Sequence, residues 1–84
     1  MKLLKLSKKG CAPCVSLSKF LSENYPEVEI EEVDVETVEG SKFLGSLGYS
    51  SVPVLTWNGL VCSGFSPAKV RKFVEDIKEM GTRE

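Results

Sequence analysis

The chain has 84 residues, of which 42% are hydrophobic and 27% are charged, so its composition fits one small globular domain and is neither disordered nor fibrous. Eleven basic residues oppose twelve acidic ones, and the net charge of -1 lacks the basic surplus that nucleic-acid binding usually needs. No run approaches the roughly 18 apolar residues of a membrane span, and the opening residues lack the apolar segment of a secretory signal. We therefore expect a cytoplasmic monomer that binds neither nucleic acid nor a membrane.

The charges are unevenly distributed along the chain. The first acidic residue comes after a series of lysines, and an acidic stretch then follows without an intervening base. This stretch contains Glu23, Glu27, Glu29, Glu31, Glu32, Asp34, Glu36 and Glu39. Runs of like charge usually face solvent, so we interpret the stretch as a solvated face rather than a docking surface.

The first half of the chain predicts a strand, a helix and a second strand. Residues 2–7 alternate leucine and lysine loosely, which is typical of a short strand. Apolar residues recur at helical spacing over residues 14–25, and Pro13 stands where a first helical turn accepts proline. Valine and isoleucine then alternate with acids over residues 28–35, with a change of phase that predicts an irregularity near Glu31 and Glu32.

The second half predicts a short helix, a hairpin and a closing helix. The short helix begins near Thr37 and ends by Gly48. Two apolar strands, residues 52–57 and 60–62, flank Asn58-Gly59, a strong signal for a two-residue hairpin turn. The last helix is capped by Ser66 and opened by Pro67, and its apolar face comprises Val70, Phe73, Val74 and Ile77.

The element order is therefore β-α-β-α-β-β-α. A right-handed βαβ unit makes the first two strands parallel, and the hairpin adds antiparallel strands to the same sheet. We expect one α/β domain over residues 1–84, a four-stranded mixed sheet flanked by three helices that cover both of its faces.

Two cysteines stand three residues apart in Cys11-Ala12-Pro13-Cys14, at the predicted junction of a strand and a helix. This context points to redox chemistry. Backbone N–H groups at the helix start, together with Lys8 and Lys9, favour a thiolate on Cys11, which would attack a disulfide. Cys14, inside the helix and less exposed, would attack the resulting mixed disulfide and release the reduced partner.

Other interpretations of this cysteine pair remain open from the residues alone. It could form a permanent disulfide or remain as inert thiols. A zinc site would need four ligands, whereas the chain offers only Cys11, Cys14 and the distant Cys62 and contains no histidine. Zinc within one chain is therefore disfavoured, which leaves open only a zinc site shared between chains of an oligomer. We expect no metal or organic cofactor besides the cysteine pair.

Three landmarks together resemble the thioredoxin and glutaredoxin superfamily over nearly the whole chain. They are the Cys-x-x-Cys motif, the segment Ser51-Val52-Pro53 before the hairpin, and the segment Ser63-Gly64-Phe65-Ser66-Pro67 before the last helix. The resemblance implies a thioredoxin-like fold in which Pro53 is a cis proline near the cysteines. It also implies that the backbone at Val52 pairs with a bound substrate segment.

The segment around Phe65 and Pro67 is similar to that of NrdH-type redoxins, small glutaredoxin-like proteins with thioredoxin-like activity. This resemblance implies a thiol-disulfide oxidoreductase that reduces protein disulfides such as that of ribonucleotide reductase and is recycled by a thioredoxin reductase-like flavoprotein. We take Lys8, Ala12, Pro13, Val52, Pro53, Gly64 and Phe65 as the candidate substrate-binding residues.

Two alternatives stand beside this interpretation. A glutathione-dependent glutaredoxin is disfavoured, because such proteins usually carry a Gly-Gly pair and then an acid where this chain has Ser63-Gly64-Phe65. A non-catalytic peptide-binding module would keep the fold and use the Val52 edge. Of the remaining residues, we expect Cys62 to be a small buried hydrophobe and Trp57 to pack on a strand face. The resemblance also makes Asp34, at the end of the second strand, a candidate for the superfamily's polar residue beneath the cysteines.

Overall fold

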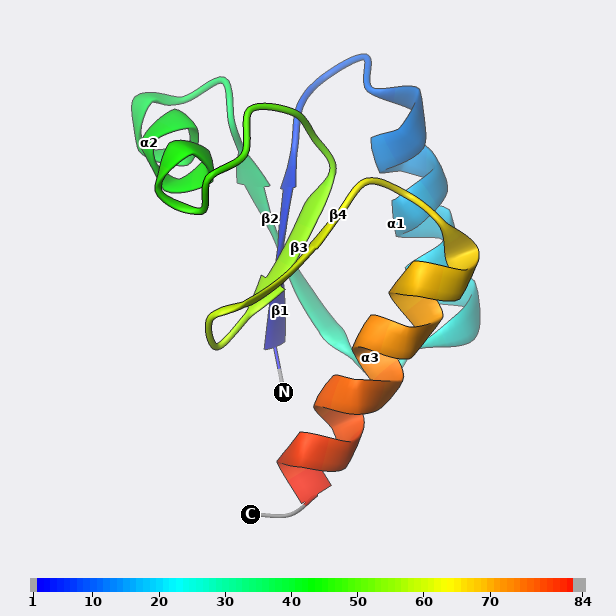
Figure 1. Ribbon diagram of the computed structural model, residues 1–84. Helices are drawn as coiled ribbons and strands as arrows, with labels where there is room; N and C mark the ends of the chain where they lie inside the picture. The colour runs from blue at the N-terminus through cyan, green and yellow to red at the C-terminus, as the bar shows by residue number, and fades with distance from the viewer. Residues whose placement is uncertain (1, 83–84) are drawn as a thin grey trace.

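The computed structural model describes residues 2–82, and its seven elements follow the predicted order. They are β1 (Lys2–Ser7), α1 (Ala12–Asn24), β2 (Glu29–Asp34), α2 (Val38–Ser46), β3 (Val54–Trp57), β4 (Leu60–Ser63) and α3 (Pro67–Thr82). The strands form one sheet in the order β2-β1-β3-β4, in which only β1 and β2 are parallel. Helices α1 and α3 lie on one face of the sheet and α2 on the other (Figure 1). This arrangement confirms the predicted thioredoxin-like fold.

The two faces of the sheet build two separate apolar clusters, because side chains alternate along each strand. The larger cluster lies between the sheet and helices α1 and α3, and it consists of Leu3, Leu17, Leu21, Tyr25, Val28, Leu55, Cys62, Val70, Val74 and Ile77. The smaller cluster lies under α2 and consists of Leu6, Leu44 and Val54, with half-buried side chains around them. Strand β1 contributes to both clusters and is therefore covered on both faces.

The predicted irregularity in the second strand is wrong. Strand β2 pairs with β1 in an unbroken parallel register from Lys2 opposite Glu29 to Ser7 opposite Asp34. The change of phase in the sequence has another cause. Ile30 packs against the larger cluster and Val33 against the smaller one, so the apolar side chains of this strand lie first on one face of the sheet and then on the other. An edge strand does this by regular alternation, without an extra residue.

Helix α2 is short and approaches the end of β2 closely. Its cap is Thr37, whose Oγ1 accepts a hydrogen bond of 3.0 Å from the Gly40 amide. A Cβ on Gly40 would collide with the backbone carbonyl oxygen of Asp34. Glycine at position 40 lowers helix propensity, but it is the residue that lets α2 pack against the end of β2.

The predicted hairpin is confirmed, with a shorter first strand. Asn58 has a φ of 50° and Gly59 a φ of 87°, as a two-residue turn with positive φ at both positions requires. Strand β3 begins at Val54 rather than at Val52, and Pro53 immediately before it has no N–H to offer a neighbouring strand.

The last helix has the predicted apolar face. It begins at Pro67, and the Ser66 carbonyl oxygen accepts a hydrogen bond of 2.9 Å from the Val70 amide. Val70, Val74 and Ile77 are fully buried. Among residues 2–82, no helix is both long enough and apolar enough to cross a membrane.

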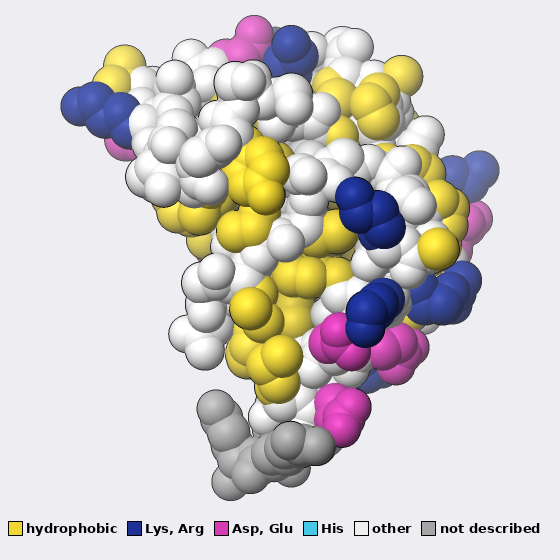
Figure 2. Space-filling model, viewed as in Figure 1, with side chains coloured by type: hydrophobic (Ala, Val, Ile, Leu, Met, Phe, Trp, Pro, Cys, Tyr) yellow, Lys and Arg dark blue, Asp and Glu magenta, His cyan; other side chains and the backbone are white. Residues whose placement is uncertain are grey.

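The surface shows how the charged residues are placed. All eight residues of the acidic stretch between Glu23 and Glu39 are exposed, as predicted. Figure 2 shows hydrophobic side chains gathered between α2 and α3, along the edge where β4 lies, with charged side chains toward α3. A groove of 370 Å³ at this edge is lined by apolar residues that include Tyr49, Val61 and Phe73, and by the charged residues Lys69, Lys72 and Asp76.

Candidate active site

Cys11 and Cys14 form a disulfide at the start of α1, with their Cα atoms 5.2 Å apart. Cys11 is the cap of the helix and has an extended backbone, with φ -92° and ψ 101°. Its Sγ accepts a hydrogen bond of 3.2 Å from the Cys14 amide, one of the N–H groups that a helix leaves without a partner in its first turn. A negative charge on this sulfur would be stabilised by the same donor and by the helix dipole.

Both cysteines are buried, whereas the two residues between them are exposed. Cys11 is 7% exposed and Cys14 is 3% exposed, so Cys14 is the less exposed residue, as predicted, although by a small margin. Ala12 and Pro13 lie at the surface. Ala12 and Pro13 are therefore the exposed part of the Cys-x-x-Cys motif.

The register of the sheet brings the other candidate segments to the same end of the molecule. Leu6 near the end of β1 lies opposite Val54 at the start of β3, and Val54 lies opposite Ser63 at the end of β4. The loop after β1, which leads to Cys11, is thus at the same end as Pro53 and Gly64. The three landmarks that are far apart in the sequence converge in space.

The peptide bond between Val52 and Pro53 is cis, as the resemblance implied. Pro53 is buried, and its carbonyl oxygen accepts a hydrogen bond of 2.8 Å from the Gly64 amide. Gly64 has a φ of 76°, a conformation that favours glycine. Within residues 2–82, the backbone of Val52 makes no hydrogen bond. The Pro53–Gly64 contact therefore holds the two loops together and leaves the Val52 backbone available.

Phe65 faces inward rather than toward solvent. It is half-buried and packs edge-on against Phe20 of α1, with ring centroids 5.9 Å apart, while the Arg71 guanidinium lies over the Phe20 ring. Its position connects the segment before α3 to the helix that carries the cysteines. Any contribution of this residue to binding would come from its exposed edge.

Lys8 and Lys9 are exposed in the loop before Cys11. They line a shallow cavity of 270 Å³ together with Ser7, Glu32 and Asp34, so positive and negative groups face each other there. Asp34 is exposed, and its Oδ1 accepts a hydrogen bond of 2.9 Å from the Glu36 amide within its own turn. The candidate role of Asp34 beneath the cysteines is therefore wrong, because its carboxylate is used to close a surface turn.

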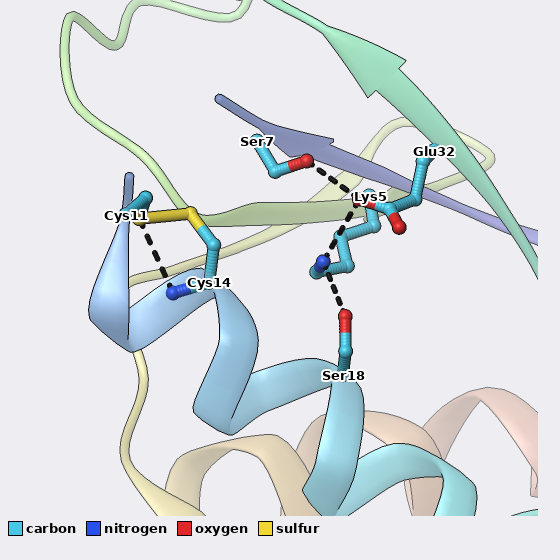
Figure 3. Close-up of a disulfide and its surroundings, with 6 residues drawn as sticks. All are labelled: Lys5, Ser7, Cys11, Cys14, Ser18 and Glu32. Atoms are coloured by element: carbon cyan, nitrogen blue, oxygen red, sulfur yellow. Dashed lines mark hydrogen bonds and ion pairs between the residues drawn. A yellow bond between two sulfur atoms is a disulfide. The ribbon is translucent and has the colours of Figure 1, made fainter. Parts of the chain in front are cut away.

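A charged network that the sequence analysis missed lies between the sheet and α1 instead. The ammonium group of Lys5 donates to Ser18 Oγ at 2.5 Å and to Glu32 Oε1 at 3.0 Å, and Ser7 Oγ donates to the same Glu32 oxygen at 2.7 Å. Figure 3 shows this series of contacts running from Ser7 through Glu32 and Lys5 to Ser18 on α1, beside the disulfide. The hydrogen bonds from Ser7 and Lys5 lower the pKa of the Glu32 carboxyl.

The alternation of β1 indicates this network only once the helices that cover the sheet are placed. Lys5 shares a face with Leu3, and Leu3 is fully buried under α1 and α3. The middle of β1 is covered on both faces, so a lysine there is buried and needs a charged partner. The middle of the neighbouring strand supplies Glu32.

Cys62 and Trp57 have the positions expected of them. Cys62 is a free thiol, 8% exposed, and belongs to the larger apolar cluster. Burial raises the pKa of this thiol, and the nearby Lys69 only partly opposes the effect. Trp57 is half-buried and packs against the same cluster. The residues described, 2–82, contain no group of three or more histidine, cysteine or acidic side chains placed to hold a metal ion.

The chain is similar to known redox proteins in both sequence and structure. It is 31% identical over 67 residues to the glutaredoxin-like protein NrdH of Lactococcus lactis, an alignment that spans 79% of this chain and 90% of the relative. The structure matches the NrdH-redoxin of Escherichia coli with a TM-score of 0.73 and 22% identity, over 86% of this chain and 93% of the other. It also matches a glutaredoxin of Archaeoglobus fulgidus with a TM-score of 0.72 and 22% identity, over 86% and 84%. No protein-family model matches the chain.

The structural matches support the fold of this chain, and the sequence match supports its family. The two structural matches show the thioredoxin-like fold, and the sequence match to the Lactococcus lactis protein, which covers most of both chains, shows the family. The close Cys11–Cys14 pair at the start of α1 agrees with that membership. The chain belongs to the glutaredoxin-like NrdH proteins of the thioredoxin/glutaredoxin superfamily and is a thiol-disulfide oxidoreductase.

Proposed function

We propose that this protein is a dithiol donor that reduces disulfides in other proteins, with Cys11 as the attacking residue and Cys14 as the resolving residue. The Cys11 thiolate attacks one sulfur of the partner disulfide, forms a mixed disulfide and displaces the partner's other sulfur as a thiolate. Cys14 then attacks Cys11, forms the Cys11–Cys14 disulfide and releases the second partner sulfur as a thiolate. Two electrons pass to the partner, and protons are exchanged with solvent.

The placement of the cysteines at the start of α1 carries this proposal. The Cys14 amide donates to Cys11 Sγ, which supports a thiolate on Cys11 more than on Cys14, whose own sulfur is a turn further into the helix. Cys11 is also slightly more exposed. Both observations favour Cys11 as the residue that meets the partner first.

The partner chain would lie across the end of the sheet where the loops converge. The Val52 backbone is available for pairing with an extended segment, a mode of recognition in which main-chain hydrogen bonds hold the peptide. Ala12 and Pro13 would contact the segment beside the disulfide, and Gly64 would let it approach closely. Lys8 is exposed nearby and would attract an acidic group of the partner.

Ribonucleotide reductase is the proposed target, and a thioredoxin reductase-like flavoprotein is the proposed source of electrons. Both follow from the NrdH-type resemblance. The Escherichia coli NrdH-redoxin, which has a similar structure, has a thioredoxin-like activity profile. A glutathione-dependent glutaredoxin is the second candidate, favoured by the match to the Archaeoglobus fulgidus glutaredoxin. The Ser63-Gly64-Phe65 segment, which lacks an acid, argues against it.

The test is turnover of a protein disulfide with two electron sources in parallel. One arm contains NADPH and thioredoxin reductase, and the other contains NADPH, glutathione and glutathione reductase. We expect turnover in the first arm only, and none with Cys11→Ser. Turnover in the glutathione arm alone would replace the proposal with the glutaredoxin alternative, and turnover in neither arm would leave a peptide-binding role.

The order of the two cysteines has its own test. Cys14→Ser should attack a disulfide partner and remain joined to it, because the resolving thiol is missing. The adduct is detected by mass spectrometry and should disappear on addition of a reductant. Cys11→Ser is the matched control. An adduct formed by Cys11→Ser alone would reverse the assignment, and equal adducts from the two variants would contradict any division of roles.

A further inference from the structure

Lys5 is the largest fully buried side chain among residues 2–82, and the proposed exchange of disulfides does not use it. Its side chain is 2% exposed. Removing an ammonium group from water is unfavourable, and a buried ion pair often contributes no more stability than a well-packed apolar residue would. Stability alone is therefore a poor reason for a lysine in the middle of β1.

The position of the Lys5 ammonium group relates it to the cysteines. It donates to Ser18 Oγ at 2.5 Å, and Ser18 follows Cys14 by four residues on α1. Residues four apart lie on the same face of a helix, with their Cβ atoms about 6 Å from each other. The ammonium group thus lies under the face of α1 that carries Cys14, as Figure 3 shows.

The Lys5–Glu32 pair is also oriented with its positive end toward α1. The ammonium group contacts Ser18 of α1, whereas the Glu32 carboxylate lies between Lys5 and Ser7 on the strands. The Glu32 side chain is 61% exposed, so water screens its charge, while Lys5 is shielded from water. The cation of this pair, rather than the anion, is therefore on the side that faces α1.

Reduction of the Cys11–Cys14 disulfide creates two thiols at the start of α1, and loss of a proton leaves a thiolate on this pair. We propose that Lys5 stabilises this thiolate through space and thereby makes the disulfide easier to reduce. This inference rests on the proposed function, because it concerns the same pair of cysteines. Lys5 is here a positioning residue, since it contacts Ser18 and Glu32 rather than the reacting sulfurs.

The test measures the equilibrium between the Cys11–Cys14 disulfide and a dithiothreitol redox buffer. Lys5→Met removes the cation with similar volume and should lower the equilibrium constant for reduction of the protein about tenfold, which is about 30 mV for a two-electron couple. Glu32→Gln removes the opposing anion and should raise the constant about threefold. The opposite signs separate an electrostatic role from a structural one.

Two further variants serve as controls. Lys5→Arg keeps the charge and should stay within about twofold of the wild-type constant. Lys19→Met makes the same chemical change as Lys5→Met at an exposed position of α1 and should leave the constant unchanged. Circular dichroism of each oxidised variant establishes that the fold is retained. If Lys5→Met does not fold, the equilibrium constants of Glu32→Gln and Lys5→Arg test the inference in its place.

Shifts of the same sign in Lys5→Met and Glu32→Gln would overturn the inference, as would wild-type behaviour of the folded Lys5→Met variant. If Lys5→Met does not fold, wild-type behaviour of Glu32→Gln overturns it. The proposed function fails in a different way. In that case the wild-type protein itself would not interconvert between dithiol and disulfide in the same buffer.

Discussion

The three cysteines of this chain are almost equally buried, yet their surroundings differ completely. Cys11 and Cys14 are 7% and 3% exposed, and Cys62 is 8% exposed. Cys11 caps a helix, and its sulfur accepts an amide hydrogen bond, whereas Cys62 lies in the middle of β4 and its side chain belongs to an apolar cluster. Burial raises the pKa of Cys62. The comparison teaches that the local backbone, rather than exposure, distinguishes the cysteines proposed to react from the one that lies in an apolar cluster.

The largest expected difference is in turnover of a protein disulfide. Cys11→Ser should lose more than about 100-fold of the activity, because the hydroxyl that replaces the thiol is a poor nucleophile at neutral pH. Cys62→Ala should stay within about twofold of wild type, because its thiol faces the apolar cluster and takes no part in the exchange. Initial rates with NADPH and thioredoxin reductase measure both. An equal loss in the two variants would remove the distinction between the cysteines.

The next difference is in the rate of alkylation of the reduced protein. Thiolates react and thiols do not, so Cys11 should be modified at least about tenfold faster than Cys62 at neutral pH. The raised pKa of Cys62 means that this thiol stays protonated to a higher pH than an ordinary cysteine. The alkylation rate of Cys62 should therefore rise only at a pH above the one at which an ordinary cysteine loses its proton. Iodoacetamide labelling at a series of pH values, followed by peptide mass spectrometry, gives both profiles. Parallel profiles would contradict the proposed difference.

The smallest difference is in stability, and here the substitution of Cys62 should have the larger effect. Cys62→Ala should lower the free energy of unfolding by about 1 kcal/mol, because it leaves a small cavity in the larger cluster. Cys11→Ser, compared under reducing conditions, should change it by less than about 0.5 kcal/mol, because serine is a good helix cap. Urea unfolding of the two variants and the reduced wild type measures this. A larger loss for Cys11→Ser would show that Cys11 is itself a structural residue.

The fold could be predicted from the sequence where local chemistry is decisive. Asn58-Gly59 predicts its turn because both residues tolerate positive φ, and the helical spacing of Val70, Val74 and Ile77 predicts a buried helix face. The irregularity at Glu31–Glu32 was wrong because apolar alternation alone does not say which face of a sheet each residue serves. That information comes only from the packing of helices on both faces.

The candidate site was predictable in its cysteines and cis proline but not in its interior. Cys11 and Cys14 form a Cys-x-x-Cys motif that is visible in the sequence, and the resemblance to the superfamily predicted the cis bond at Pro53. Lys5 was counted only among the charges of the chain, because a single lysine between leucines is compatible with an exposed strand face. Its burial depends on α1, which follows later in the sequence, and its partner Glu32 lies 27 residues away. Long-range pairing of this kind leaves no short motif.

The same register that gathers the landmarks at one end of the sheet places the hairpin turn at the other. Val54 and Ser63 pair at the end where the cysteines lie, and Trp57 and Leu60 pair at the opposite end, next to Asn58 and Gly59. About 10 Å of strand separates the two pairs. Asn58 and Gly59 are exposed, so a fluorescent dye, an electrode tether or an inserted affinity peptide attached there would leave the disulfide free to meet its partners.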